Sequence, residues 1–404
     1  MRSLFASPWF QLYLWLGTVA GGLVVYNELS AHSYSRIWRA PQQNAGGDSS
    51  VTDSSAQPAS VSAKTESVPP AGKTPHPPVV SSKPAGSQAA MTVSAPGGGA
   101  VAALPAAREV IDRGALRTMR DPSGGVSALA VTRTGTLIAA AGEDRIIRLW
   151  NVMTGQVDRS LAGHDSAIAT LAFSPDGRSL ASGGADNTVR LWDVATGQVQ
   201  HVLTGAERWV LALAWSPDGR TLAAGDGDAK VRLWDAGTGS PSRTLVGHDR
   251  WISALGFSPD GQVLASGSGD FLVRLWRLSS GAQLAPLRLH TGYVKALAWS
   301  PDGRTIATGS ADMTMAIGDP WTGTQVRRIN SGEGAIYALV FSADGRLLVS
   351  GAYNGRLQIF DVATGAPLQS VVAHQQTIVG LALTAGQRLV TASADGSIRL
   401  WQIH

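Results

Sequence analysis

Short runs of apolar and β-branched residues, separated by turn-forming residues, fill the chain from about residue 108 to its last residue. The pattern is clearest in residues 156–197, where the second and third runs are joined by Ser-Pro-Asp-Gly at 174–177. In that turn Pro favours an early position and Gly accepts a positive φ. Runs of this length between such turns predict four antiparallel β-strands. The expected strands are at about 156–161, 167–173, 179–183 and 188–193.

The same unit recurs with an almost constant period. The tryptophans that close successive units stand 42 residues apart, at Trp150, Trp192, Trp234 and Trp276. Gly318 and Phe360 hold the next two positions, and Trp401 falls one residue early. A fixed period of this length indicates copies of one supersecondary unit. Seven four-stranded copies without helical periodicity predict an all-β, seven-bladed β-propeller over residues 107–404.

The two ends of the repeat region are expected to close the ring together. The last unit ends soon after its third strand, and residues 115–119 (Ala-Leu-Arg-Thr-Met) form an additional run before the first inner strand at 126–131. We expect residues 115–119 to pair beside residues 397–402. This pairing would remove the open sheet edges that promote aggregation.

The repeated residues resemble the WD-repeat family. Its Gly-His pair stands at Gly163-His164 and Gly247-His248, and its Trp-Asp pair at Trp192-Asp193 and Trp234-Asp235. The resemblance covers all seven units and implies a scaffold for protein–protein interactions. It also implies a structural tetrad in which a carboxylate orients an imidazole, a hydroxyl bridges to that ring, and an indole N–H donates to the hydroxyl. The residues at these positions are His164, Ser182, Asp186 and Trp192; His248, Ser266, Asp270 and Trp276; and His374, Thr391, Asp395 and Trp401.

These tetrads are not interpreted as catalytic or metal sites. A Ser-His-Asp hydrolase needs one exposed nucleophile, whereas this set recurs around the ring and commits its hydroxyl to a tryptophan. For the same reason we expect the histidines of the Gly-His pairs to be structural. The arginines before the repeated tryptophans, spread around the ring, are expected to lie on solvated strand faces. They are Arg148, Arg190, Arg232, Arg274 and Arg399.

Several units depart from the tetrad pattern and are expected to depend on packing instead. The fifth unit has lost its tryptophan to Gly318, and Trp321 is a candidate to replace it. We expect the fifth and sixth blades to be the least stable. The other departures are Pro122 and Ala140 in the first unit, Ala206 and Ala224 in the third, and Gly332, Asn354 and Phe360 in the sixth.

Differences between the copies are the nearest signal of function. Just before the inner strand, three adjacent blades carry the large aromatics Trp209, Trp251 and Tyr293, and two of them add an arginine. Tyr, Trp, Arg and Met are enriched at interface hot spots, so this rim is a candidate protein-binding surface. The alternative is that Trp209 and Trp251 only pack against neighbouring loops. Three further residues, Phe271, Met313 and Tyr353, stand in the Asp-containing turns where other copies have Arg145, Asn187 or Gly396. The candidate rim consists of Arg208, Trp209, Arg250, Trp251, Phe271, Tyr293, Met313 and Tyr353. Lys295 and Tyr337 are expected near the mouth of the central channel.

The N-terminal part has a different composition. Residues 8–26 carry no charge and would form a helix about 28 Å long, close to the hydrocarbon thickness of a bilayer. We interpret residues 1–7 as a short tail, 8–26 as a transmembrane anchor and 27–106, rich in Pro, Ser, Ala and Gly, as a disordered linker. The alternatives for the apolar segment are a signal peptide, cleaved near Ala31-His32-Ser33, and a buried helix of the domain.

The side of the membrane is weakly constrained by charge. Arg2 precedes the apolar segment and Arg36 and Arg39 follow it, which by the positive-inside rule favours a cytoplasmic propeller. The long linker instead resembles the spacers of membrane-anchored bacterial envelope proteins. We therefore expect a single-pass inner-membrane protein with a periplasmic propeller, the alternatives being a cytoplasmic propeller and a soluble periplasmic one.

Composition narrows the function classes. With 44% hydrophobic residues the chain can build a large core, and a net charge of +4 does not indicate a nucleic-acid-binding domain. The absence of cysteine excludes disulfides and thiol chemistry. The sequence therefore predicts a non-catalytic, monomeric propeller without cofactor that is tethered to a membrane and binds proteins. The alternative is an envelope enzyme or small-ligand sensor that uses the central channel.

Overall fold

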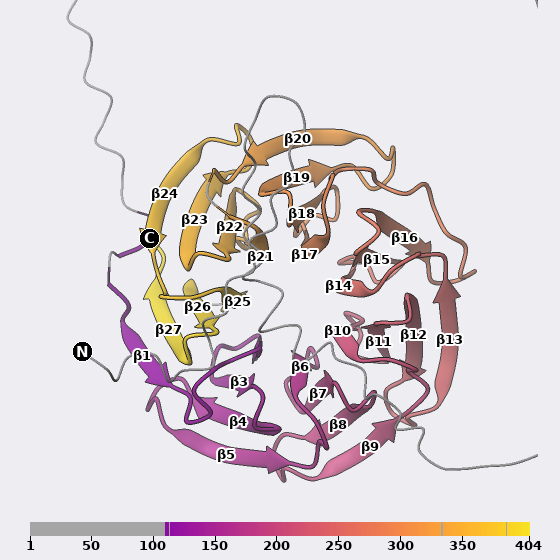
Figure 1. Cartoon of the computed structure of the whole chain (residues 1–404), viewed down its shortest axis with the longest axis vertical. Coiled ribbons are helices and arrows are strands. Elements are labelled where there is room, and N and C mark those ends of the chain that lie inside the picture. The colour runs from indigo at the N-terminus through magenta and orange to yellow at the C-terminus, as the bar shows by residue number, and fades with distance from the viewer. Residues whose placement is uncertain (1–109, 113, 333, 385) are drawn as a thin grey trace, which may run out of the picture. The chain divides into compact units, whose positions relative to one another are not determined.

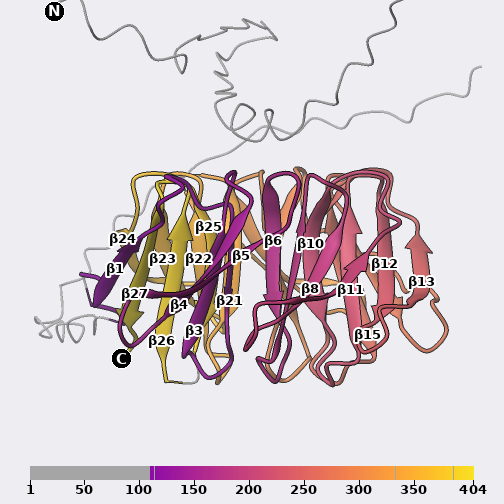
Figure 2. The ribbon, with the colours of Figure 1, turned by 90° about the horizontal axis from the view of Figure 1, so that it is seen from below.

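The computed structural model describes residues 110–112, 114–332, 334–384 and 386–404. Within these residues, seven antiparallel sheets are arranged radially around a central axis, as Figure 1 shows. Figure 2, turned by 90°, shows the strands running between two faces formed by turns and loops. The predicted seven-bladed, all-β propeller is confirmed.

Each blade is a meander whose first strand is innermost. Blade 1 contains β2 (Ala128–Val131), β3 (Leu137–Ala141), β4 (Ile146–Asn151) and β5 (Val157–Ala162). Blade 2 contains β6 (Ile168–Phe173), β7 (Ser179–Gly184), β8 (Val189–Asp193) and β9 (Val199–Leu203). Blade 3 contains β10 (Val210–Trp215), β11 (Thr221–Asp226), β12 (Lys230–Asp235) and β13 (Pro241–Val246). Blade 4 contains β14 (Ile252–Phe257), β15 (Val263–Ser268) and β16 (Val273–Arg277).

The remaining three blades complete the circle. Blade 5 contains β17 (Val294–Trp299), β18 (Ile306–Ser310), β19 (Thr314–Gly318) and β20 (Gln325–Asn330). Blade 6 contains β21 (Ile336–Phe341), β22 (Leu347–Ala352), β23 (Arg356–Asp361) and β24 (Pro367–Val372). Blade 7 contains β25 (Ile378–Leu383), β26 (Arg388–Ser393), β27 (Ser397–Gln402) and β1 (Arg117–Arg120).

The apolar core lies in the layers between neighbouring blades. One buried cluster joins Leu191 of blade 2 to Val210 and Trp234 of blade 3. The approach is closest at a glycine of the second strand, where a Cβ on Gly183 would lie 2.5 Å from Cγ1 of Val210. Such a contact is too short for any other residue, so this glycine permits the blades to pack. Gly225, Gly267, Gly309 and Gly351 make the equivalent approach to Ile252, Val294, Ile336 and Ile378.

The ring closes as the sequence predicts. Strand β1 pairs antiparallel with β27, with Arg117 opposite Leu400 and Arg120 opposite Ser397. Met119 of β1 is buried in a cluster that also contains Ile398. A second contact lies just before β1, where Ile111 forms an isolated bridge with Ile403. One strand from the start of the repeat region therefore supplies the fourth strand of blade 7.

Blade 4 departs from the prediction of four strands per unit. Its outer edge is held by two isolated bridges, Val273 with Leu287 and Trp276 with Gln283, and no continuous fourth strand forms. Pro286 lies within this edge, and proline has no N–H to donate to a sheet. The expected strand is thus interrupted at the residue that cannot take part in the ladder.

The predicted tail, anchor and linker, residues 1–7, 8–26 and 27–106, lie outside the described residues. Among the residues that are described, no helix has the length and apolar character needed to cross a bilayer.

We expect the substitution Met119→Ala to lower the free energy of unfolding by about 2–4 kcal/mol, because it leaves a cavity at the closing strand. Leu116→Ala is the matched control, since Leu116 precedes the same strand and is 52% exposed. Chemical denaturation measures both variants. Equal losses for the two would show that closure does not depend on the buried side chain of β1.

Candidate functional site

The tetrads predicted in blades 2 and 4 are present and nearly identical. In blade 2 the His164 ring nitrogens lie 2.7 Å from Oδ2 of Asp186 and 2.6 Å from Oγ of Ser182, and the Trp192 indole donates to Ser182 over 2.7 Å. In blade 4 the corresponding distances for His248, Asp270, Ser266 and Trp276 are 2.7, 2.8 and 2.8 Å. All polar groups at the centre of each tetrad are therefore paired, as a buried network requires.

Blade 7 contains a modified tetrad. His374 contacts Thr391 through Nε2 at 2.6 Å, and Trp401 donates to the same hydroxyl over 3.0 Å. Its Nδ1 lies 2.8 Å from Oγ of Ser397 and 3.5 Å from Asp395, and the Ser397 hydroxyl donates to Asp395 over 2.5 Å. A serine hydroxyl is thus inserted between the predicted carboxylate and the imidazole.

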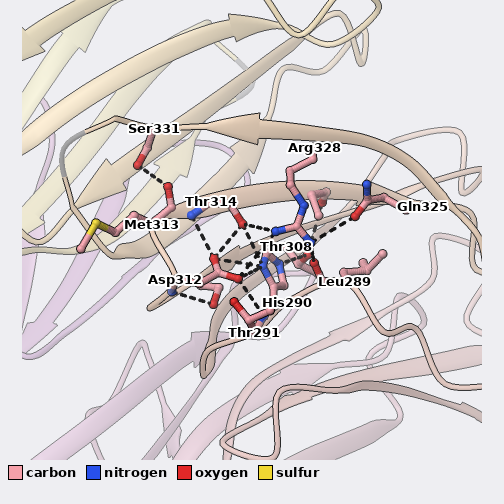
Figure 3. Close-up of polar contacts among 12 residues, drawn as sticks. Leu289, His290, Thr291, Thr308, Asp312, Met313, Thr314, Gln325, Arg328 and Ser331 are labelled. Atoms are coloured by element: carbon pink, nitrogen blue, oxygen red, sulfur yellow. Dashed lines mark hydrogen bonds and ion pairs between the residues drawn. The ribbon is translucent and has the colours of Figure 1, made fainter. Parts of the chain in front are cut away.

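Blade 5 contains a polar network that the sequence analysis missed, drawn in Figure 3. His290 contacts Thr308 through Nε2 at 2.8 Å and Asp312 through Nδ1 at 3.1 Å. Thr314 adds a hydroxyl 3.1 Å from Nδ1, and Arg328 donates to Thr314 over 3.3 Å. The signal was available, because Thr308 and Asp312 each stand 42 residues after their blade 4 counterparts.

The prediction that Trp321 replaces the missing blade 5 tryptophan is wrong. Trp321 is 54% exposed and lies against Trp299, with ring centroids 6.5 Å apart. The space beside Gly318 is instead lined by two leucines, since a Cβ on Gly318 would lie 3.1 Å from Leu289 and 3.4 Å from Leu287. Apolar packing therefore takes the place of the indole.

Blades 1 and 3 replace the tetrad with ion pairs. Arg148 contacts Asp121 at 3.0 Å and Asp144 at 2.6 Å. Arg232 pairs with Asp226 and, at 3.0 Å, with Asp228. The Arg148 and Arg232 side chains are only 11% and 10% exposed, and those of Arg190 and Arg274 are 15% and 13% exposed. The prediction of solvated arginines is therefore wrong for these four positions. Removing one partner of such a pair leaves a buried charge uncompensated.

The electrostatics of the tetrads stabilise a charged aspartate beside each histidine. Burial raises the pKa of Asp270, but the electrostatic interaction and hydrogen bond with His248 and the backbone hydrogen bonds from Leu272 and Asp249 outweigh it and lower the pKa to about 2. The pKa of Asp186 is lowered in the same way by His164. For His374 burial dominates and lowers its pKa to about 4, against the opposing effect of Asp395.

The candidate rim contains a continuous aromatic cluster. The Tyr293 ring lies 5.0 Å from that of Trp251 and 5.5 Å from that of Phe271. The Lys295 ammonium lies 5.8 Å from the centre of the Tyr293 ring and 5.4 Å from that of Tyr337. Burial lowers the pKa of Lys295 to about 8. Tyr337 in turn lies 6.3 Å from Tyr353, so the cluster connects blades 4, 5 and 6. We call these residues, with Trp209 and the exposed Arg208, Arg250 and Met313, the aromatic rim.

Packing accounts for part of this rim. A Cβ on Gly269 would lie 2.6 Å from the Trp251 ring, so that indole rests against the glycine and against Tyr293. Phe271 and Met313 differ, being 37% and 55% exposed and having positive φ values of 74° and 65°. A positive φ is disfavoured for bulky side chains, so these two residues are not required by the turn.

Tyr353 does not occupy the position assigned to it. Gly355, with φ 76°, stands at the positive-φ position that Phe271 and Met313 hold in their blades. The N–H of Tyr353 donates to Ala335 as that of Gly269 donates to Trp251, so Tyr353 corresponds to Gly269. It remains part of the aromatic rim through Tyr337.

No metal site is apparent in the described part of the chain, where His, Asp and Glu form no group of three able to hold an ion. The tetrad hydroxyls are buried and hydrogen-bonded on both sides, which does not suit a nucleophile.

Two family models match parts of the repeat region. A family model of the first β-propeller of IFT122 matches residues 209–404. A model described as WD domain, G-beta repeat, matches residues 114–151 and 155–193. None of the curated proteins matches the chain.

We expect the free energy of unfolding to decrease as the pH is lowered, because of the buried His374 imidazole. The unfolded imidazole has a pKa of about 6.5, so between about pH 6.5 and 4 the unfolded chain binds more protons than the folded chain. Stability from the neutral imidazole is therefore complete above this window and is lost as pH falls through it, by about 3 kcal/mol. Denaturation at several pH values should show a shallower dependence for His374→Gln, although this variant is less stable at pH 7. An unchanged slope would contradict the assignment.

Proposed function

Because the chain folds into a WD-repeat seven-bladed β-propeller, we propose that it acts as a non-catalytic scaffold that binds partner proteins through the aromatic rim. The observation that carries the proposal is the aromatic cluster from Trp251 to Tyr353, flanked by exposed side chains. Phe271 and Met313 are exposed at turns where a smaller residue would be less strained. Aromatic residues, Arg and Met gathered on one face are typical of interface hot spots.

The rim combines apolar and cationic groups. Arg208 and Arg250 are exposed beside Trp209 and Trp251, and Lys295 lies among the tyrosine rings. A partner segment with aromatic or aliphatic side chains and at least one carboxylate would match this chemistry. The alternative function is a small-ligand sensor or enzyme that uses the central channel. The described residues contain no group of three His, Asp or Glu side chains that could hold a metal ion there.

We expect the variant Phe271→Ala/Met313→Ala/Arg250→Ala to lose partner binding by at least about tenfold, because these side chains would form the contact. Their exposure means that the midpoint of thermal unfolding should change little. The matched control is Val202→Ala/Val246→Ala, which removes exposed apolar groups from the outer strands β9 and β13. Quantitative crosslinking in cells measures partner capture. Equal capture by wild type and the rim variant would exclude this surface, and a large loss of stability would favour packing.

We further propose that residues 8–26 tether the propeller to the inner membrane and that residues 27–106 let it extend into the periplasm. The proposal is supported by the uncharged 19-residue segment with aromatic residues near its ends. A cytoplasmic propeller and a cleaved, soluble form are the alternatives.

A reporter enzyme that is active only outside the cytoplasm, fused after residue 404, tests this topology. We expect activity in the membrane fraction that resists alkaline carbonate extraction. Replacing Leu16 and Val19 by Arg should release the fusion from the membrane, because each central charge costs about 2.5–3.5 kcal/mol. Activity only in the soluble fraction would indicate cleavage, and no activity would indicate a cytoplasmic propeller.

A further inference from the structure

A recurring contact between blades points to a second site. An arginine on the outermost strand of one blade contacts the next blade. It reaches the hairpin that joins the third and fourth strands of that next blade. Arg159 of β5 donates to the carbonyls of Thr196 and Ala195 over 2.9 and 2.7 Å. The same side chain covers the hairpin glycine, since a Cβ on Gly197 would lie 2.7 Å from Cδ of Arg159. Equivalent arginine–carbonyl contacts occur at three other junctions. They join Arg117 to Thr154, Arg243 to Leu278, and Arg327 to both Ala363 and Thr364.

The contact between blades 2 and 3 departs from this series. His201, 42 residues after Arg159, lies against the hairpin glycine Gly239 in the same way, but its shorter side chain makes one longer hydrogen-bond contact, 3.2 Å from Nε2 to the carbonyl of Gly237. The hairpin residue at the same junction is also smaller, because Ala236 stands where neighbouring repeats have Val194 and Leu278. Two side chains at this one junction are therefore shorter than their counterparts in neighbouring repeats.

A groove of about 710 Å³ lies at this junction. It is lined by the Ser-Pro-Asp-Gly turns of blades 2 and 3, by Gln200 and His201 of β9, and by Trp215, Ala236 and Gly237 of blade 3. These turns follow the inner strands, whereas the aromatic rim precedes them. In an antiparallel meander the two lie at opposite ends of the strands, on the opposite faces seen in Figure 2. The groove is therefore separate from the aromatic rim.

The junction between blades 4 and 5 shows how such a space is otherwise filled. There Ala285 occupies the arginine position, and its Cβ is 3.8 Å from a Cβ built on Gly323. Trp299 corresponds to Trp215, and the exposed Trp321 of the next hairpin packs beside it. In blade 3 the residue corresponding to Trp321 is Gly237, which leaves the Trp215 ring accessible from the groove.

The lining of the groove favours a cation. Asp176 and Asp218 each accept through Oδ1 a serine hydroxyl, at 2.6 and 2.5 Å, and a backbone N–H at 3.0 Å. The serine bonds lower the pKa of both carboxyls, so both are charged at neutral pH. No Lys or Arg is among the lining residues. The nearby Arg178 and Arg220 are exposed.

The indole favours a planar cation over a compact one. Trp215 is partly buried, and its N–H already donates to the carbonyl of Ala172 over 3.0 Å. The indole N–H is thus already used, and the part of the Trp215 ring that lines the groove can stack against a bound group. A guanidinium can stack on an indole while its N–H groups bind a carboxylate, which an ammonium cannot do as well.

We propose that this groove binds an arginine side chain of an extended segment in a partner protein. Trp215 provides the stacking surface, and Asp176 and Asp218 accept from the guanidinium. His201 and Gly237, which also line the groove, would lie beside the bound arginine side chain.

The test uses the full chain and the tripeptide acetyl-Gly-Arg-Gly-amide, with the lysine and citrulline peptides for comparison. Citrulline keeps the planar shape of arginine without its charge. Saturation-transfer NMR and calorimetry should detect the arginine peptide, at least about fivefold weaker binding of the lysine peptide, and no binding of the citrulline peptide. Equal binding of citrulline, or no binding of arginine at millimolar concentration, would overturn the proposal.

Two variants locate the binding. His201→Arg/Ala236→Val copies Arg159 and Val194 of the preceding repeat, so it should fill the groove and abolish binding without lowering the midpoint of thermal unfolding. Asp176→Asn/Asp218→Asn should weaken binding at least about tenfold by removing the charges. The matched control is Asp302→Asn, which alters the same turn in blade 5 and should bind as the wild type does. Unchanged binding by the filled variant would overturn the proposal, and the aromatic-rim variant should bind the peptide normally.

Discussion

The close approach between neighbouring blades is the constraint on which the rest of the propeller depends. Glycine in the second strand lets the β-branched residue at the start of the next inner strand come within contact distance, as at Gly183 and Val210. Because the apolar core lies between blades, no blade can bury its surface alone, and the ring must close. The pairing of β1 with β27 closes it and joins residues that are about 280 positions apart in the sequence.

Polar networks complete six of the seven blades in different ways. Blades 2 and 4 have full tetrads, blade 7 inserts Ser397, and blade 5 uses Thr308 with leucine packing beside Gly318. Blades 1 and 3 use arginine–aspartate pairs instead. In blades 2, 4 and 7 the tetrad hydroxyl pairs the buried indole N–H, which has no partner in blade 1, where Ala140 replaces the hydroxyl residue. The repeated positions are therefore structural, which leaves function to the positions that differ.

The two faces of the ring offer different chemistry. The aromatic rim presents aromatic rings with Lys295, Arg208 and Arg250, which suits an apolar segment with acidic residues. The groove between blades 2 and 3 presents Trp215 with two carboxylates. A scaffold with sites of opposite preference on opposite faces could hold two partners at once.

The period of 42 residues, read from the sequence alone, was sufficient to determine the blade count, three tetrads and the closing strand, because these depend on residue order along the chain. It also located the aromatic positions of blades 3 to 5. Only the tertiary structure decided what each departure means. Trp321 lies against Trp299 and not in the tetrad, the arginines are buried in ion pairs, and His201 with Ala236 opens a groove. The physical reason is that these side chains contact residues on other strands or loops, some in the same blade and some in the next, so the space each one fills is set by the packed structure and not by its own position in the repeat.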